Sequence, residues 1–323
     1  MLLKVPCNEW VNYNDYTQVW YASKEKQLIR ILKKEIEFFK PKVLFINGIY
    51  SWYFNLVPLM FCRATRKIIS VRGMLHPGAL SQKAFKKKTY LLFFKLAGLH
   101  RRYAFHASDE NEKKYIQDIF GDKIRVYVAK NFPKRLLQQQ PLKKTRDTLE
   151  LVAIALISPM KNILTVLLAL QHATENIVYN IYGSVKDEPY WKTCLEKIKL
   201  MPLNVVVKYH GHVEPSKVEE VLMYSHVFIL PSKSENFGHA IFEALSAGKP
   251  VITSNNTPWK NLAHSKAGIN VDNDSVSLQN AISLFAAMEY EEYSLWSKNA
   301  GIYATNAIRF EEIKKQYKSM FAT

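Results

Sequence analysis

The sequence is poor in the features that mark disulfide-rich, membrane-spanning or repetitive proteins. Its three cysteines, Cys7, Cys62 and Cys194, lie far apart and share no metal-ligand spacing. This pattern indicates ordinary buried residues in a reducing compartment. No run of about 20 apolar residues is present, so no membrane-spanning helix is expected. The start of the chain lacks the long apolar core of a secretory signal peptide, and internal repeats and low-complexity tracts are absent.

Acidic residues are missing from a long part of the chain. Between Phe38 and Ser108 there are 13 Lys or Arg residues and no Asp or Glu. The chain has a net charge of +17, and residues 1–145 alone carry +18, so the second half is nearly neutral. A solvated surface chosen for solubility would explain a moderate excess of bases. An acid-free run of this length favours a face that meets an anionic partner, either a membrane surface, a phosphorylated lipid or a nucleic acid.

The rest of the composition is that of an ordered globular protein, with 323 residues of which 48% are hydrophobic. Short runs rich in β-branched residues alternate with helical patterns. Because these runs lack a strict apolar–polar alternation, they predict parallel strands covered on both faces, and hence an α/β fold. The expected strands are residues 43–47, 67–71, 103–107 and 124–128 in the first half, and 150–156, 177–182, 204–209, 226–230 and 250–253 in the second.

The polar, proline-punctuated segment 133–148 is the expected linker between two domains. We therefore predict two Rossmann-like domains. The N-terminal one, residues 1–140, is short and strongly basic, and the C-terminal one covers residues 149–303. A helical pattern over residues 304–323 is expected to return toward the N-terminal domain. Ligands of such sheets bind beyond the C-terminal ends of the strands, where the site is expected.

The stretch "SENFGHAIFEALSAGKPVI" begins at Ser234, just after the expected strand 226–230. Its helix is predicted to begin near Gly238 and to end at Ala247, since Gly-Lys-Pro follows. The first-turn N–H groups of such a helix offer an anion site that is reinforced by the helix dipole. Gly238 would allow a phosphate to approach closely because it has no side chain. The N–H groups in question belong to Phe237, Gly238 and His239.

Two glutamates flank this predicted turn. Glu243 lies about one and a half turns into the helix, where its carboxylate can accept two hydrogen bonds from a vicinal diol such as a ribose. Glu235 precedes the helix and is expected to point into the cleft. Alternatively, Glu243 is an exposed helix residue and Glu235 a partner of the helix dipole. The glycine and the position at a strand end favour the functional interpretation.

The stretch "LISPMKN", residues 156–162, also follows a buried strand. Ser158 is a suitable N-cap and Pro159 a suitable first helical residue, which places Lys161 in the first turn. A cation there opposes the helix dipole, as expected if it faces a diphosphate. An exposed lysine with a small energetic penalty is an equally good interpretation of this stretch alone.

Two further features are weaker. Gly183 ends a strand in "IYGSV", where the backbone of a ligand-binding loop could approach closely. His210 and His212 occupy alternate positions in "YHGHVEP" and could bind a metal. No cysteine or carboxylate stands at ligand spacing beside them, so no metal is expected.

These motifs together resemble the group 1 retaining glycosyltransferases, whose fold is GT-B. The resemblance rests on "PSKSENFGHAIFEALSAGKPVITSNNTPW", with Glu235 and Glu243 separated by seven residues, and on "SPMKN" as a phosphate-binding turn. "FHASDENEKKYIQDIFG", "NFP" and "SVRGMLHPGALSQKAFKKK" resemble parts of the N-terminal domain in members that build bacterial lipopolysaccharide or capsule. The resemblance extends from about Pro41 to the C-terminus and is strongest over residues 150–275.

The resemblance implies transfer of a sugar from a nucleotide-diphosphate donor, with retained anomeric configuration and without a metal or other cofactor. It implies that Glu243 binds the donor ribose, Lys161 the diphosphate and Glu235 the transferred sugar. A cationic cluster at a helix end would stabilise the charge of the leaving nucleotide. Further residues implied in donor binding are Gly183, Ser232, Asn236, Phe237, Gly238 and His239.

The sequence departs from the family pattern at two places. The family usually has an arginine five positions before the phosphate-turn lysine, and here that position is Leu156, so Arg72 is a candidate replacement. The family's first strand and glycine-rich loop have no counterpart before Trp10, which implies a shortened N-terminal domain. Arg72 and His76 lie where the family places catalytic groups on the acceptor side.

The basic, aromatic segment 72–102 suits the interface of an anionic membrane. An ordinary domain helix with core aromatics and solvated lysines is the alternative. The expected protein is therefore a cytoplasmic enzyme on the inner face of the plasma membrane, acting on a lipid-linked, lipopolysaccharide or capsule glycan. Two other hypotheses are a GT-B nucleotide-binding protein that lacks turnover, and a nucleic-acid binder. The last ranks lowest because no nucleic-acid recognition motif is present.

Overall fold

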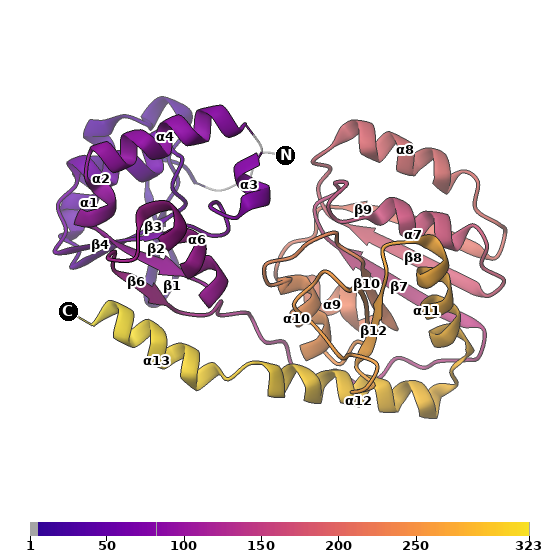
Figure 1. The fold of residues 1–323 in the computed structure, drawn as a ribbon. Coiled ribbons are helices and arrows are strands. Elements are labelled where there is room, and N and C mark those ends of the chain that lie inside the picture. The colour runs from indigo at the N-terminus through magenta and orange to yellow at the C-terminus, as the bar shows by residue number, and fades with distance from the viewer. Residues whose placement is uncertain (1–5, 82, 323) are drawn as a thin grey trace. The chain divides into compact units, whose positions relative to one another are not determined.

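The computed structural model describes residues 6–81 and 83–322. The chain forms two compact units (Figure 1). Unit 1 comprises Met1–Asn131 and Glu311–Thr323, and unit 2 comprises Phe132–Phe310. Both contain parallel sheets flanked by helices, as the sequence predicts. No helix within the described residues is long and apolar enough to cross a bilayer.

Unit 2 is built on a six-stranded parallel sheet with the strand order β12-β11-β10-β7-β8-β9. Successive side chains of a strand point to opposite sides, so the central strands are covered on both faces, whereas the edge strand β9 is largely exposed. In β10, for example, Val227 and Ile229 join one core, and Phe228 and Leu230 join the other. The strands are β7 (Thr148–Ile154), β8 (Asn176–Tyr182), β9 (Val205–Gly211), β10 (Val227–Leu230), β11 (Val251–Ser254) and β12 (Gly268–Val271).

The helices of unit 2 cover the two cores of the sheet. The first core is closed by α7 (Ile163–Leu170), α8 (Glu188–Ile198) and α11 (Ser275–Ala287). The second is closed by α9 (Val218–Met223) and α10 (His239–Ser246), and α12 (Tyr290–Ala307) contributes to both cores, with Tyr293 and Trp296 in the first and Ala300 and Ala304 in the second. Because β7, β8 and β10 are parallel neighbours, the loops that follow their C-terminal ends all emerge along one edge of the sheet.

Unit 1 contains a four-stranded parallel sheet in the order β3-β4-β5-β6. Its strands are β3 (Val43–Asn47), β4 (Arg66–Ser70), β5 (Ala104–Ala107) and β6 (Val126–Val128). Its other elements, in chain order, are hairpin strands β1 (Trp10–Asn14) and β2 (Thr17–Trp20), a 3-10 turn (Lys24–Lys26), α1 (Ile29–Phe39), a π-helical turn (Trp52–Leu56), α2 (Val57–Phe61), α3 (Pro77–Ser81), α4 (Ala84–Leu96), α5 (Leu99–Arg102) and α6 (Glu110–Phe120).

The last helix, α13 (Phe310–Phe321), belongs to unit 1 from Glu311 onward, while α12 belongs to unit 2. Met320 is buried against Ile68 and Ala104, and the Phe321 ring lies 5.6 Å from that of Phe45. The guanidinium of Arg66 donates to the Met320 carbonyl at 3.0 Å. These contacts attach the end of the chain to the N-terminal sheet (Figure 1).

Segment 133–148 is not a free linker, and this corrects the expected boundary. Leu136 is buried in the second core of unit 2, and its N–H donates to Ser246 Oγ at 3.0 Å. The buried Lys144 ammonium donates to the carbonyls of Ala286 and Met288 at 2.8 and 3.0 Å. The polarity and the prolines of this segment suggested a linker. Neither feature reveals that its residues contact partners more than a hundred positions away in the sequence.

Three other local features differ from the sequence-based expectations. The antiparallel hairpin β1–β2 and strand β12 had not been predicted. Cys7, expected to be buried, is exposed, whereas Cys62 and Cys194 are buried.

Lys249 is an unusual buried cation. It is 1% exposed, and its ammonium has no hydrogen-bond partner among the residues that the structure describes. Burial lowers its pKa to about 8. Leaving an amine unpaired in a core costs free energy, so we expect Lys249→Met to raise the free energy of unfolding by about 1–2 kcal/mol.

Urea unfolding at pH 7 measures this change, with exposed Lys192→Met as the matched control. Between pH 8 and the ordinary lysine pKa of 10.5 the unfolded state binds more protons, so Lys249 makes stability rise with pH. That rise should be smaller in Lys249→Met. A less stable variant would contradict the interpretation.

Candidate functional site

Three loops of unit 2 meet at the C-terminal edge of its sheet. Residues 155–162 follow β7, Gly183 follows β8, and residues 231–238 follow β10. β7 lies between β8 and β10, so the three loops are neighbours. The Lys233 N–H donates to the Met160 carbonyl at 2.8 Å, which joins the first loop to the third. The two motifs singled out in the sequence are therefore in direct contact.

The Glu235 carboxylate is the centre of this contact. The Lys161 ammonium donates to its Oε1 atom, and Ser232 Oγ donates to the same atom at 2.8 Å. The side chains of Lys161 and Glu235 are 24% and 12% exposed, so water screens the pair only in part. Ser232 itself is fully buried, and its carbonyl accepts a hydrogen bond from Ser254 Oγ.

Lys161 lies before its helix and not within the first turn, which corrects the sequence-based placement. Its N–H donates to the Ser158 carbonyl at 3.0 Å, which closes a tight turn. α7 begins only at Ile163, with Asn162 as a left-handed N-cap residue. Ser158 is therefore not the N-cap. The turn, and not a helix dipole, aims the ammonium toward Glu235.

The Phe237–Gly238 turn is held by the aromatic side chain of Trp259. The Trp259 indole N–H donates to the Phe237 carbonyl at 2.6 Å, and the two rings lie 5.3 Å apart. Gly238 has φ +76° and is the N-cap residue of α10, as the sequence predicts. A Cβ atom there would lie 3.2 Å from Trp259 Nε1. Asn236 and His239 are exposed on either side of the turn.

Glu243 lies on α10 and is half-buried. Burial raises the pKa of its carboxyl, and the charge of Lys134 counteracts this in part. The carboxylate has no hydrogen-bond partner among the described residues, so its oxygen atoms can accept hydrogen bonds from a ligand.

Gly183 connects the strand ends beneath these loops. Its N–H donates to the Gly211 carbonyl at 2.6 Å, and its own carbonyl accepts from Tyr209 Oη at 2.9 Å. Its backbone passes so close to Ala155 that a Cβ atom would lie 1.7 Å from the Ala155 carbonyl oxygen. The sequence indicated a close approach at this glycine, but the partner is protein backbone.

The two histidines after β9 have different environments. His210 stacks on Tyr182 with ring centroids 4.4 Å apart, and its Nε2 atom lies 2.9 Å from Asn180 Oδ1. His212 lies 3.8 Å from a Glu214 carboxylate oxygen. Over residues 6–81 and 83–322, no group of three or more His, Cys, Asp or Glu side chains could hold a metal ion.

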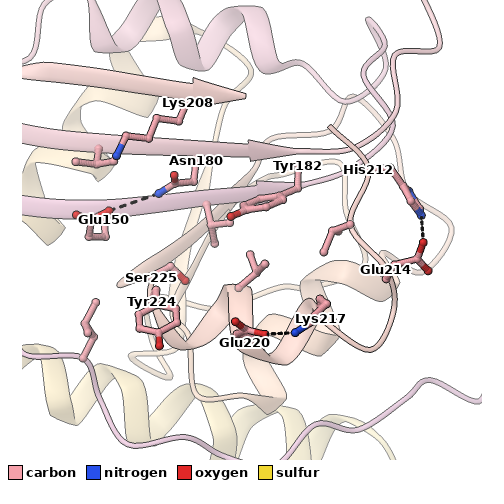
Figure 2. A pocket seen from close by; sticks show the side chains of 15 residues that line it. Glu150, Asn180, Tyr182, Lys208, His212, Glu214, Lys217, Glu220, Tyr224 and Ser225 are labelled. Carbon is pink, nitrogen blue, oxygen red and sulfur yellow. Dashed lines mark hydrogen bonds and ion pairs between the residues drawn. The ribbon is translucent and has the colours of Figure 1, made fainter. Parts of the chain in front are cut away.

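A separate hollow of about 650 Å³ lies against the sheet face between β7, β8, β9 and α9 (Figure 2). Glu150, Asn180 and Lys208 line it from three successive strands, and Glu220 lines it from α9. The Lys217–Glu220 ion pair of 2.9 Å closes one side. None of the candidate donor-binding residues lines this hollow.

Arg72 and His76 belong to unit 1, at the C-terminal edge of its own sheet. Arg72 has φ +49°, and its guanidinium donates to Asn131 Oδ1 at 2.8 Å and to Asn47 Oδ1 at 3.4 Å. His76 Nδ1 accepts from the Gly78 N–H at 3.0 Å. Both side chains are thus held by neighbours of their own unit.

Sequence reasoning missed Glu112, which holds the Arg72 loop. This carboxylate is buried at 6% exposure and accepts hydrogen bonds from the N–H groups of Gly73 and Ser108. Asp109 caps α6 by accepting from the Glu112 N–H at 2.8 Å. The spacing of Asp109 and Glu112 is that of a capping box, which is the signal that could have revealed Glu112.

The model of the family "Glycosyl transferases group 1" matches residues 134–301, just over half of the chain. The chain belongs to the group 1 glycosyl transferases. It is also 33% identical over 92 residues to the 2-deoxystreptamine N-acetyl-D-glucosaminyltransferase of Niallia circulans. That match covers 28% of this chain and only about a quarter (24%) of the relative's length.

Solved structures share the fold of this group 1 glycosyl transferase. Anabaena HepE in complex with UDP and glucose has a TM-score of 0.68 at 17% identity, covering 93% of this chain and 83% of that one. Sucrose-phosphate synthase from Thermosynechococcus elongatus has a TM-score of 0.71 at 17% identity, covering 99% and 87%. WaaG, a glycosyltransferase involved in lipopolysaccharide biosynthesis, has a TM-score of 0.60 at 12% identity, covering 80% and 79%. These likenesses confirm the predicted GT-B fold.

The family match divides the candidate residues of this glycosyl transferase into two sets. Lys161, Glu235 and Glu243, with the other donor-side candidates, lie within the matched residues 134–301. Arg72 and His76 lie outside them. The family membership predicted from the motifs is confirmed, and the roles of individual side chains stay predictions.

Proposed function

We propose that this protein transfers a sugar from a nucleoside-diphosphate donor to a glycan acceptor, with retention of configuration and without a metal ion. The observation that carries the proposal is the joined pair of loops in which Lys161 and Ser232 both donate to Glu235. A partly buried cation and a turn at a helix N-terminus, flanked by the exposed residues Asn236 and His239, lie at one sheet edge, which is the chemistry that a diphosphate requires.

The Lys161–Glu235 pair suggests how the donor engages the site. A diphosphate carries more negative charge than one carboxylate, so it would draw the Lys161 ammonium away from Glu235. The released Glu235 oxygen atom could then accept a hydrogen bond from a sugar hydroxyl. As the bond to the nucleotide breaks, Lys161 and the first N–H groups of α10 would stabilise the charge that develops on the leaving diphosphate. Positive charge from the protein would replace that of a metal.

The acceptor side of the proposal rests on the basic unit 1 and on the proteins that share the fold. We propose a lipid-linked or lipopolysaccharide-type glycan as acceptor, with the enzyme at the cytoplasmic face of the membrane and Arg72 and His76 acting on the acceptor side. WaaG is named for lipopolysaccharide biosynthesis, and the Staphylococcus aureus protein TarM has been solved with α-GlcNAc-glycerol and UDP.

Calorimetric titration of the purified protein with UDP, GDP, ADP and dTDP tests the donor site. UDP is the first nucleotide to test because HepE and TarM have been solved in complex with UDP. We expect one nucleotide to bind and Glu243→Ala to weaken it by roughly 10- to 100-fold, since the variant loses hydrogen bonds to a charged group. Because burial raises the pKa of Glu243, the affinity should begin to fall at a higher pH than an exposed glutamate would give.

Glu196→Ala, which changes an exposed glutamate of α8, is the matched control and should bind as the unchanged protein does. The matching sugar nucleotide is then tested for transfer to a glycan acceptor. Nucleotide binding without transfer would support the alternative of a GT-B protein that lacks turnover. If a folded protein binds none of the four nucleotides, the donor-site proposal fails.

A further inference from the structure

The N-terminal edge of the unit 1 sheet is strongly basic. The strands β3, β4, β5 and β6 are parallel, so their first residues lie along one edge, opposite the edge that carries Arg72. Six cations line two hollows there, of about 590 and 310 Å³. We call this set the basic edge: Arg66, Lys67, Arg101, Arg102, Lys123 and Arg125.

The two hollows adjoin each other, and both are lined by positively charged side chains. Arg102, Tyr103 and Arg125 line both of them. Asp122 is the single acid among the lining residues, so the basic edge carries a local charge of about +5. Lys40 and Lys42 precede β3 at the same edge and are exposed. Such a concentration of one charge raises the local concentration of anions.

Among the described residues, hydrogen bonds hold two of the six cations, and the guanidinium carbon of Arg102 lies 5.6 Å from the centroid of the Tyr103 ring. Arg66 donates to the Met320 carbonyl at 3.0 Å, and Lys67 donates to the Leu59 carbonyl at 2.7 Å. The other four side chains are exposed, and none of them forms an ion pair with a described residue. They are Arg101, Arg102, Lys123 and Arg125.

The negative ends of helix dipoles do not balance the positive charge of the basic edge. Four helices, α1, α2, α5 and α6, end shortly before the strands of this edge. Each helix C-terminus carries about half of a negative charge. Together they would offset roughly 2 charges, which leaves more than half of the positive charge of about +5 without a counterpart among the helix ends.

Exposed apolar side chains lie at the C-terminal ends of helices that precede the strands of this edge. Phe38 and Phe61 lie at the C-terminal ends of α1 and α2 and are 75% and 42% exposed. Leu96 ends α4, six positions before Arg102, and is 79% exposed. A soluble polyphosphate gains nothing from apolar groups, and an exposed leucine such as Leu96 offers no ring on which a nucleic-acid base could stack. Cations interleaved with apolar side chains are typical of a surface that binds the headgroup region of a bilayer.

We propose that the basic edge binds the anionic surface of a lipid bilayer. Lipid phosphates enter the two hollows beside Arg102 and Arg125, and Phe38, Phe61 and Leu96 enter the boundary between headgroups and acyl chains. This deepens the membrane-associated function proposed above, because it places the contact at a strand edge and not along α4.

The position of the basic edge restricts the acceptor. β4 has five residues, so its C-terminal end stands ~16 Å from the basic edge. Arg72 follows that end and would lie at least this far from the lipid phosphates. The acceptor hydroxyl must then belong to a glycan that extends from the lipid, since a hydroxyl or phosphate at the headgroup itself would lie too deep.

Co-sedimentation with vesicles tests the proposal. The wild-type chain is mixed with vesicles of phosphatidylcholine alone or with 40% phosphatidylglycerol, a composition chosen to give about the surface charge of an anionic leaflet. The variant Arg101→Glu/Arg102→Glu/Arg125→Glu is compared with Lys192→Glu/Lys199→Glu/Lys298→Glu, which changes net charge equally on exposed positions of unit 2. A third variant, Lys86→Glu/Lys88→Glu/Lys95→Glu, changes α4.

We expect the wild-type chain to bind only the anionic vesicles, and the basic-edge variant to bind at least tenfold more weakly than the unit 2 control. Phe38→Ser/Leu96→Ser should make the remaining binding more sensitive to salt. Nucleotide titration of the same variants should be unchanged, which separates this proposal from the donor site. The proposal fails if the α4 variant alone loses binding, if the edge variant binds normally, or if tripolyphosphate or RNA binds but vesicles do not.

Discussion

Replacing Gly183 by alanine is expected to destabilise unit 2 by about 4 kcal/mol or more, which is among the largest effects of a single substitution. The backbone at Gly183 has φ +143°, which side chains rarely permit, and a Cβ atom would lie 1.7 Å from the Ala155 carbonyl oxygen. Both obstacles are backbone, so no side-chain rotation relieves them. The loop that follows Ala155 bears Lys161, so the strain would reach the candidate site directly.

Urea unfolding followed by tryptophan fluorescence measures the loss, because Trp191, Trp259 and Trp296 are buried in unit 2. Gly211→Ala is the matched control. Gly211 has φ +73° at the end of the adjacent strand, but a Cβ atom there meets nothing within 4 Å. We expect the control to lose only about 1 kcal/mol, from the left-handed backbone alone. Equal losses in the two variants would show that steric conflict with Ala155 is unimportant.

The second large effect concerns acid stability and depends on His226. This side chain is 4% exposed, and burial is the main reason that its pKa falls to about 4. Its Nδ1 atom accepts from the Glu150 N–H at 2.9 Å, and its Nε2 atom donates to the Lys143 carbonyl at 3.0 Å. If the ring took up a second proton, that proton would be on Nδ1, where it would point at the Glu150 N–H and remove this hydrogen bond. The nearby charges of Lys144 and Lys249 further disfavour the protonated ring.

The direction of the pH effect follows from proton binding. Between the ordinary histidine pKa of 6.5 and about 4, the unfolded chain holds a proton at His226 and the folded chain does not. Stability should therefore fall as the pH is lowered through this range, by roughly 3 kcal/mol from this group alone. Below about pH 4 the folded protein also binds the proton, and this contribution levels off.

Urea midpoints between pH 7 and pH 4 measure this loss. His226→Asn keeps one acceptor and one donor but cannot titrate, so its stability should fall less with acid. His264→Asn, at an exposed histidine, should behave as the unchanged protein does. If His226→Asn loses as much stability on acidification as the wild-type chain, the acid sensitivity has another source.

Most of the secondary structure could be predicted because it depends on local sequence. Apolar runs such as 226–230 predict buried parallel strands, and β10 spans Val227–Leu230. Gly238 and the Gly-Lys-Pro sequence predict the limits of α10, which spans His239–Ser246. The hairpin β1–β2 escaped prediction since its residues are mostly exposed and carry no clear alternation.

The candidate site was predictable in its residue types but not in its contacts. The motifs indicated Lys161 and Glu235 as two separate ligand groups. The structure joins them in one ion pair because the loops after β7 and β10 leave neighbouring strands. Leu136 and Lys144 likewise attach the expected linker to unit 2 through partners distant in sequence.

The sequence by itself determined that this protein is a two-unit α/β chain of the group 1 glycosyl transferases, with a basic first half. Periodicity, turn residues and motif spacing act over a few residues and are legible without coordinates. Only the tertiary structure decided that Glu235 is held by Lys161, that Gly183 fits against Ala155, and that six dispersed cations share one strand edge. These depend on strand order and register, because parallel pairing brings together residues that the chain separates by dozens of positions.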